Sequence, residues 1–327
     1  MADKSKIEWT DASWNPIVGC SIVSPGCTNC YAMKQAARIE LMTIGENAAR
    51  AADSRDARLG QIQSHYAGTT KQTNGGAVWT GKISEAPQHI LTAPLRWKRP
   101  RRIFVNSMSD LFHESVPDAW IDRVFAVMAL CPQHTFQVLT KRSERMRRYA
   151  SDFHVAHDRD VCVRIADAAS DWGDLYPGAI RKRWPLRNVW LGVSAEDRRR
   201  YAERKDDLRA TPAAVHFFSF EPLLGKIDAD YLGEWAIIGG ESGPGARPMH
   251  PDWARAIRDQ CAAAGVPFFF KQHGEWIGLP DDRGPISTPD DRVHQFDDGE
   301  VCYRVGKRRA GRLLDGVEYN AFPEAML

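Results

Sequence analysis

The chain has 327 residues, of which 43% are hydrophobic and 26% are charged, and its formal net charge is +2. This composition excludes a disordered, collagen-like or coiled-coil protein, and no apolar run is long enough for a membrane span. The polar stretch Met1–Trp9 lacks the apolar core of a signal peptide, so we expect a cytoplasmic protein. With 44 basic and 42 acidic side chains, the overall charge does not indicate a partner.

Short apolar runs predict parallel strands, because each has strand length and is rich in β-branched or aromatic residues. In chain order they are Ile17–Val18, Ile103–Val105, Phe136–Leu139, Val189–Val193, Val215–Phe218, Trp235–Ile238 and Val266–Phe270. Helix-like stretches such as Pro117–Cys131 and Pro251–Ala264 lie between these runs. The alternation predicts an α/β fold, a complete or partial (β/α) barrel of about six or seven parallel strands.

Two insertions interrupt this alternation, at about residues 53–100 and 151–187. A helical stretch from Tyr31 to about Ala52 precedes the first insertion. Residues 274–327 are rich in Gly, Pro and Asp, which predicts an irregular C-terminal extension. We therefore expect a barrel over residues 1–273, with the extension packed on it.

Polar side chains follow most of the predicted strands directly. Parallel α/β folds bind ligands at the carboxyl ends of their strands. Ser, Thr and Asp at these ends are also explained as helix caps, but capping does not readily explain the charged side chains. The set comprises Asn106, Ser107, Ser109, Asp110, Thr140, Lys141, Arg142, Ser194, Glu196, Ser219, Glu221, Glu241, Ser242, Lys271, Gln272 and His273. It predicts a ligand site at this end of the barrel.

Residues 239–245 form a glycine-rich loop with the sequence GGESGPG. Glycines let a backbone approach a ligand closely and expose amides to a phosphate or carboxylate. The loop matches neither the Walker pattern nor the dinucleotide fingerprint. A tight turn without a ligand is the alternative.

Three of the seven cysteines, Cys20, Cys27 and Cys30, lie within eleven residues with the spacing C-x6-C-x2-C. An odd number of cysteines without an export signal argues against a disulfide framework. A structural zinc ion takes four ligands, usually as two close pairs, and this sequence has no second Cys-x-x-Cys. An iron–sulfur cluster held by three thiolates keeps one iron open. Iron–sulfur, zinc, and buried or redox-sensing thiols without metal all remain open on spacing alone.

Several further motifs accompany the cysteine loop: Ile7–Asp11, Trp14–Pro16, Phe104–Phe112, Leu139–Arg142, Ser219–Gly225, Gly239–Gly243 and Phe269–Gln272. A three-cysteine loop after the first strand of a partial barrel resembles the radical S-adenosylmethionine (SAM) superfamily. Its Cys-x-x-Cys-Tyr end is most similar to the spore photoproduct lyase-like branch. Together the motifs resemble the phage-associated three-cysteine-motif proteins over nearly the whole chain.

The resemblance implies that Cys20, Cys27 and Cys30 ligate a [4Fe–4S] cluster whose open iron chelates the amino and carboxylate groups of SAM. An electron from the reduced cluster would cleave SAM to methionine and a 5′-deoxyadenosyl radical, which abstracts hydrogen from a substrate. Expected partners are a reductant such as flavodoxin or ferredoxin and a phage-encoded protein. The first cysteine gap is longer than the superfamily's commonest C-x3-C-x2-C, and the Gly-Gly-Glu motif follows a late strand.

The resemblance also distributes roles among the strand-end residues. Cofactor contacts are expected from Asn106, Ser107 and Ser109 at the SAM amino group, Ser194 and Glu196 at the ribose, and Gly239, Gly240 and Glu241. Catalytic roles are expected for Lys141, Glu221 and Lys271. Substrate contacts are expected from Tyr31, Asp110, Arg142, Gln272 and His273.

Lys141, Arg142, Lys271 and His273 lie at the functional end and are suited to neutralising phosphates. The expected substrate is therefore a nucleic acid or nucleotide, and the reaction a base modification or lesion repair. One alternative is a zinc-dependent hydrolase with Glu221 or Glu241 as general base. Another is a non-enzymatic, metal-stabilised module that binds nucleic acid or a phage partner.

Overall fold

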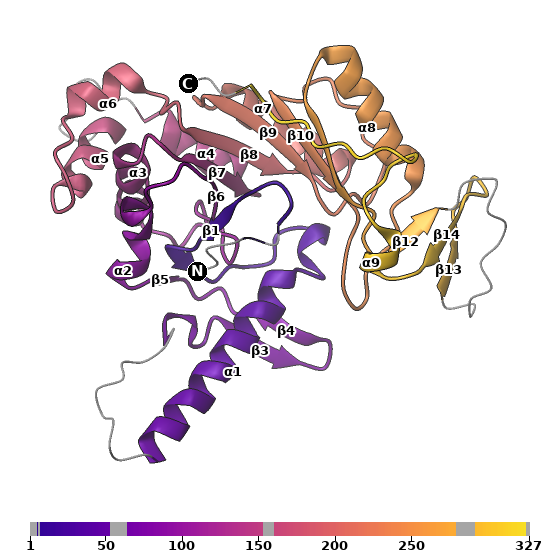
Figure 1. Ribbon diagram of the computed structural model, residues 1–327, viewed down its shortest axis with the longest axis horizontal. Helices are drawn as coiled ribbons and strands as arrows, with labels where there is room; N and C mark the ends of the chain where they lie inside the picture. The colour runs from indigo at the N-terminus through magenta and orange to yellow at the C-terminus, as the bar shows by residue number, and fades with distance from the viewer. Residues whose placement is uncertain (1–4, 6, 53–63, 153–159, 279–291, 325–327) are drawn as a thin grey trace.

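A computed structural model describes residues 5, 7–52, 64–152, 160–278 and 292–324. Its main element is a sheet of seven parallel strands that curls into a half-barrel (Figure 1). The strands are β1 (Ala12–Trp14), β6 (Arg102–Val105), β7 (Thr135–Thr140), β8 (Val189–Ser194), β9 (Val215–Phe220), β10 (Trp235–Gly239) and β11 (Phe268–Gln272). They lie in the sheet in their chain order. The predicted α/β partial barrel is confirmed at this level.

The first strand of the sheet differs from the predicted one. β1 pairs in parallel with β6, whereas β2 (Ile17–Val18) pairs antiparallel with β5 (Ser84–Glu85) outside the half-barrel. Pro16 separates β1 from β2 and has no backbone N–H to give to a ladder, so the strand ends before it. The remaining six predicted strands coincide with β6 to β11 within one or two residues at most ends.

Helices cover the convex face of the sheet. They include α3 (Asp118–Leu130), α4 (Ser143–Ala150), α7 (Arg198–Ala210) and α8 (Pro251–Ala264). Outward strand residues such as Ile103 and Val105 join helix residues such as Phe125 and Ile257 in one large buried cluster. The left-handed Gly265 ends α8, as its place after Ala264 predicts.

The concave face carries a second, aromatic cluster. Phe104 lies on it, between Ile103 and Val105 of the outer cluster, as the period of two in a strand requires. Trp9, Trp190, Phe217, Trp235 and Phe269 are the other large buried side chains of this inner cluster. The C-terminal segment packs on it through Phe322, whose ring centroid is 5.1 Å from that of Trp235.

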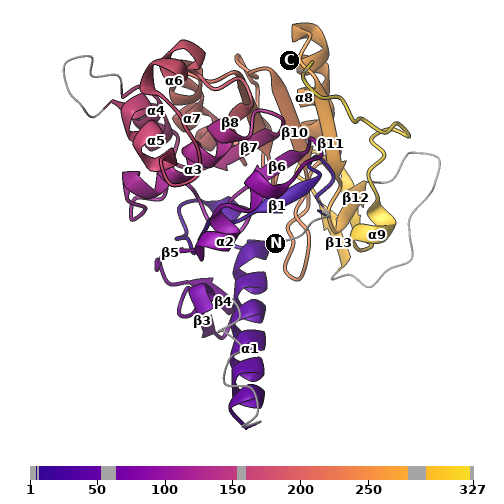
Figure 2. The ribbon, with the colours of Figure 1, turned by 60° about the vertical axis from the view of Figure 1, so that its left-hand side comes forward.

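The insertions and the tail contain more structure than predicted. Helix α1 (Tyr31–Ala52) projects from the half-barrel beside a hairpin of β3 (Thr70–Thr73) and β4 (Gly76–Trp79), as Figures 1 and 2 show. A short helix α2 (Gln88–Leu91) follows, and α5 (Val161–Ala169) packs on α3 and on α6 (Pro177–Arg183). Residues 53–63 and 153–159 of the predicted insertions lie outside the described residues.

The C-terminal extension is not irregular throughout. It forms a three-stranded antiparallel sheet of β12 (Trp276–Gly278), β14 (Val301–Arg304) and β13 (Val293–Gln295), followed by α9 (Lys307–Ala310). Each strand is only three or four residues long, so the sequence gives too short a pattern to detect. Among the described helices, none combines the length and apolar character needed to cross a lipid bilayer.

Candidate metal centre

A pocket opens at the carboxyl ends of the half-barrel strands, above the inner aromatic cluster. Ile7, Trp9, Phe104 and Leu139 of that cluster line it. The predicted site residues that also line it are Cys20, Cys27, Cys30, Tyr31, Asn106, Ser107, Ser109, Asp110, Thr140, Lys141, Arg142, Ser194, Ser219, Glu221, Gly240, Glu241, Ser242, Lys271 and Gln272. The predicted residues outside the lining are Glu196, Gly239 and His273. The fold thus brings most of the predicted site together.

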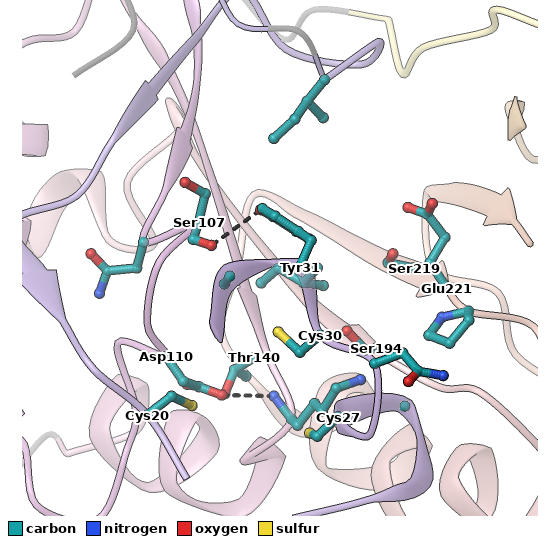
Figure 3. Close-up of a pocket in the computed structure, with 18 of the residues that line it drawn as sticks. Cys20, Cys27, Cys30, Tyr31, Ser107, Asp110, Thr140, Ser194, Ser219 and Glu221 are labelled. Carbon is teal, nitrogen blue, oxygen red and sulfur yellow. Dashed lines mark hydrogen bonds between the residues drawn. The ribbon is translucent and has the colours of Figure 1, made fainter. Parts of the chain in front are cut away.

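The three cysteines lie at one end of this pocket (Figure 3). Cys27 ends the short 3-10 turn Pro25–Cys27 and is buried, while Cys20 and Cys30 are half-buried. The Cys30 amide donates to the Cys27 carbonyl at 3.2 Å, which closes the Cys-x-x-Cys turn. Burial raises the pKa of the Cys20 thiol to about 12; the Asp110 carboxylate adds to that rise, and Arg142 opposes it. All three thiols line the same pocket.

The metal-binding donors of the cysteine loop are three thiols. Tetrahedral zinc needs its sulfur ligands about 3.8 Å apart. Among the described residues, no three His, Cys, Asp or Glu side chains are arranged to hold one metal ion. A cluster of four irons spreads three thiolates around a larger core. Three thiols that line one pocket are the donor set that such a cluster takes when one iron stays open.

Glu196 holds the cysteine loop from the end of β8. Its fully buried carboxylate accepts a hydrogen bond from the Gly26 amide at 3.0 Å and from Arg204 Nη1 at 3.1 Å, and Lys141 Nζ lies 3.6 Å away. Burial alone would raise the pKa of Glu196, but Lys141, Ser24, Arg204 and the Gly26 amide together lower it to about 2. The expected ribose contact of Glu196 stays a prediction; its carboxylate faces these protein groups and does not line the pocket.

Glu241 holds the same loop from the end of β10. Its carboxylate accepts hydrogen bonds from Asn29 Nδ2 at 2.9 Å and from Arg247 Nη2 at 2.5 Å. Arg247 also donates to the Pro25 carbonyl at 2.9 Å. Burial raises the pKa of Glu241, yet Arg247 and Asn29 bring it below its usual value. Its geometry favours a structural role over the expected cofactor contact.

The glycines before Glu241 serve close packing. A Cβ on Gly240 would lie 2.0 Å from the His273 carbonyl oxygen, and one on Gly239 would lie 2.5 Å from Glu221 Oε1. The Gly240 amide donates to the Gln272 carbonyl at 3.0 Å, so it is not offered to an anion. The tight-turn alternative therefore describes these two glycines better than an anion cradle.

Asn106 differs from its neighbours Ser107 and Ser109. The serine hydroxyls donate to Asn15 Oδ1 at 3.1 Å and to the Ile17 carbonyl at 2.7 Å, which ties them to the N-terminal segment. Asn106 is only 2% exposed, has a positive φ of 60°, and finds no hydrogen-bond partner for either side-chain polar atom among the described residues. Buried polar groups without partners are rare, and a left-handed non-glycine residue at such a place is typical of a ligand site.

Asp110 and Arg142 are bound to each other. Arg142 Nη1 donates to Asp110 Oδ2 at 2.9 Å, and Asp110 also accepts hydrogen bonds from Thr140 Oγ1 at 2.6 Å and the Lys141 amide at 3.0 Å. Arg142 Nε donates to both oxygens of Glu114 at 3.1 Å. The expected role of Arg142 in substrate binding stays a prediction; in this structure its guanidinium is bound to two carboxylates.

The three residues expected to be catalytic line the pocket. Lys271 Nζ and Glu221 Oε1 form an ion pair at 2.9 Å, with both side chains about one-sixth exposed. Lys141 Nζ is buried, and within the part of the chain that the structure describes it has no hydrogen-bond partner besides the 3.6 Å ion pair with Glu196. Lys141 is therefore better placed than Lys271 to donate to a ligand.

The remaining predicted residues divide between the pocket and its surroundings. Tyr31 is half-exposed at the pocket and its hydroxyl donates to the Ser107 carbonyl at 3.1 Å (Figure 3). Gln272 lines the pocket with an unpartnered Oε1. His273 lies outside the lining, because its ring packs on Phe270 and hydrogen-bonds the Leu313 carbonyl at 2.8 Å. A substrate contact from His273 has no support in this geometry.

Sequence reasoning missed three residues that hold the loop: Asn29, Arg204 and Arg247. Asn29 lies inside the Cys-x-x-Cys turn, and that position could have marked it as part of the site. Arg204 and Arg247 bind carboxylates only eight and six positions away, but neither spacing is a recognised motif, so sequence patterns do not mark them.

One protein-family model matches residues 4–323, and the family is described as "Protein of unknown function (DUF5131)". No curated protein matches the chain. No solved structure matches it either. The match covers the half-barrel, the cysteine loop and almost all of the C-terminal extension.

Proposed function

We propose that this chain, which belongs to the DUF5131 family of proteins of unknown function, is a radical SAM enzyme that uses a [4Fe–4S] cluster. The observation that carries the proposal is the arrangement of one pocket. Cys20, Cys27 and Cys30 lie at one end of it, at the carboxyl ends of a parallel half-barrel, together with the unpartnered carboxamide of Asn106.

The cysteines and Asn106 would have separate tasks. Cys20, Cys27 and Cys30 would hold the cluster through their three thiolates. The bound cluster would supply one electron, taken from a flavodoxin or ferredoxin, for the reductive cleavage of SAM to methionine and a 5′-deoxyadenosyl radical. Asn106 offers both a donor and an acceptor to the amino and carboxylate groups of SAM.

The substrate would enter beside Lys141, Lys271 and Glu221. Lys141 offers its ammonium to an anionic group, and the Lys271–Glu221 pair supplies a donor and an acceptor that are already oriented. Residues of the inner aromatic cluster line one wall of the pocket. An apolar wall of this kind would keep water away from a reactive radical. A nucleotide or nucleic acid, with phosphates for the lysines and a base for the pocket, is the proposed substrate class.

The zinc-hydrolase alternative lacks comparable support. It needs Glu221 or Glu241 as a free general base, but Glu221 is paired with Lys271 and Glu241 with Arg247. The non-enzymatic alternative uses the same cysteine loop. An assay for SAM cleavage distinguishes the two, because only the proposed enzyme would cleave SAM.

Anaerobic reconstitution with iron and sulfide tests the proposal. We expect a brown protein that, after dithionite reduction, converts SAM to 5′-deoxyadenosine and methionine, measured by mass spectrometry. Replacing Cys20, Cys27 and Cys30 together with alanine should abolish both colour and SAM cleavage. Cys261→Ala is the matched control, because that thiol is buried in the outer core, away from the pocket.

SAM cleavage that survives in the triple variant would refute the proposal. A colourless wild-type protein that binds one zinc would instead support the alternatives. Mass spectrometry of DNA and RNA pools after incubation with the active protein then identifies the modified nucleotide.

A further inference from the structure

Arg142 reaches the cysteine loop as well as its two carboxylates. Its guanidinium donates to Ser21 Oγ at 2.8 Å through Nη2 and to Cys20 Sγ at 3.7 Å through Nη1. The side chain is only 6% exposed. With Nε bound to Glu114 and Nη1 shared with Asp110, every nitrogen of the guanidinium has a protein partner. Its orientation toward the sulfur is therefore fixed.

We propose that Arg142 raises the reduction potential of the cluster by donating a hydrogen bond to the sulfur of Cys20. The inference rests on the proposed function, because it needs a cluster at Cys20. Reduction adds one negative charge to the cluster, and a cationic donor at a ligand sulfur stabilises that charge. Arg142 acts through Cys20 and is thus a positioning residue.

The carboxylates beside Arg142 reduce the positive electrostatic potential that its guanidinium exerts at the Cys20 sulfur. Asp110 is buried beside it, whereas the side chain of Glu114 is 64% exposed. Glu114→Gln keeps an acceptor for Arg142 Nε but removes one neutralising charge. This variant should raise the potential, while Arg142→Gln should lower it. Opposite shifts from two neighbouring residues are not expected from general damage to the fold.

The experiment is a redox titration of the reconstituted full-length protein, with the reduced cluster followed by EPR. We expect a more negative midpoint potential for Arg142→Gln and a less negative one for Glu114→Gln. Arg147→Gln and Glu144→Gln are matched controls on α4. Arg147 pairs with Asp207 at 2.9 Å and Glu144 is exposed, so both should keep the wild-type potential.

An unchanged potential in cluster-loaded Arg142→Gln or in Glu114→Gln would overturn the inference. Should Arg142→Gln fail to hold its cluster, Glu114→Gln decides alone: an upward shift supports the inference and an unchanged potential overturns it. A wild-type protein that takes up no cluster contradicts the proposed function instead, and this result is seen before any variant is compared.

Discussion

Glu196 and Glu241 both hold the cysteine loop, but from strand ends with different access to water. Glu196, after β8, has no exposed side-chain surface and lies between two cations, Lys141 and Arg204. Glu241, after β10, is nearly as buried, but its partner Arg247 is one-third exposed. The same chemical group therefore anchors the loop once inside the protein and once at its edge.

Because the cations paired with Glu196 are more buried than Arg247, which pairs with Glu241, removing the two carboxylates should have different costs. A cation left without its partner in the interior keeps the full cost of its burial. A cation at the edge can turn to water and recover part of its solvation. The loop should therefore depend more on the β8 anchor than on the β10 anchor.

Glu196→Gln should have the largest effect. It leaves Lys141 and Arg204 without a counter-charge, and breaking a buried pair costs about 3 to 5 kcal/mol. Urea denaturation of the apoprotein measures this loss as a decrease in the free energy of unfolding. The control is Glu203→Gln on α7, whose exposed pairs with Arg199 and Arg200 are worth less than about 1 kcal/mol. Equal losses in the two variants would contradict the comparison.

The stability difference between wild type and Glu196→Gln should also depend on pH. The pKa of Glu196 is lowered from 4.5 to about 2, since Lys141 and Arg204 face it and Arg200 lies nearby. Because the pKa of Glu196 is lower in the folded than in the unfolded state, its ionised form stabilises the fold. This stabilisation is complete at pH values above the unfolded-state pKa and is lost as the pH falls through the folded-state pKa. The shift corresponds to about 3 kcal/mol.

Other carboxylates titrate in both proteins, so the difference isolates Glu196. Urea unfolding at pH 7, 5 and 3 should show a constant difference between the first two values and a smaller one at pH 3. A difference that persists unchanged to pH 3 would show that the ionised form of Glu196 is not what stabilises the loop.

The half-barrel could be predicted because each of its strands is marked by a pattern of apolar residues within a short stretch of the sequence. Val189–Ser194 is buried at all six positions, and a continuous apolar run is what a strand covered on both faces requires. The same rule places polar residues at the carboxyl ends, so the meeting of the cysteine loop with Asn106 and Lys141 followed from the fold class. The first strand of the half-barrel is predicted wrongly: the sequence favours the apolar pair Ile17–Val18, and a run of two residues is too short to decide.

The role of each polar residue could not be predicted in this way. Asn29 and Glu241 are 212 positions apart, and Arg247 reaches Pro25 over 222 positions. No periodicity records which donor meets which acceptor across such separations. The sequence therefore predicts ligand contacts for Glu196 and Arg142 without showing that the fold also binds both to protein groups.

Glu241→Gln should have an intermediate effect. Arg247 keeps its hydrogen bond to the Pro25 carbonyl and can be hydrated, so we expect a loss of about 1 to 2 kcal/mol. Adding Arg247→Gln to this variant should cost less than the sum of the two single changes, because both remove the same pair. Strict additivity in urea denaturation would mean that the two residues act on the loop independently.

Asn106→Gly should change the free energy of unfolding least of these variants. Both carboxylate anchors have protein partners, whereas the Asn106 carboxamide has none among the described residues and sits at a positive φ of 60°. Glycine adopts this backbone freely, so unfolding free energy should change by less than about 1 kcal/mol. Affinity for SAM, measured by calorimetry on the reconstituted protein, should fall, because the donor and acceptor facing the pocket are gone. Retained SAM affinity with lowered stability would make Asn106 a structural residue like Glu196.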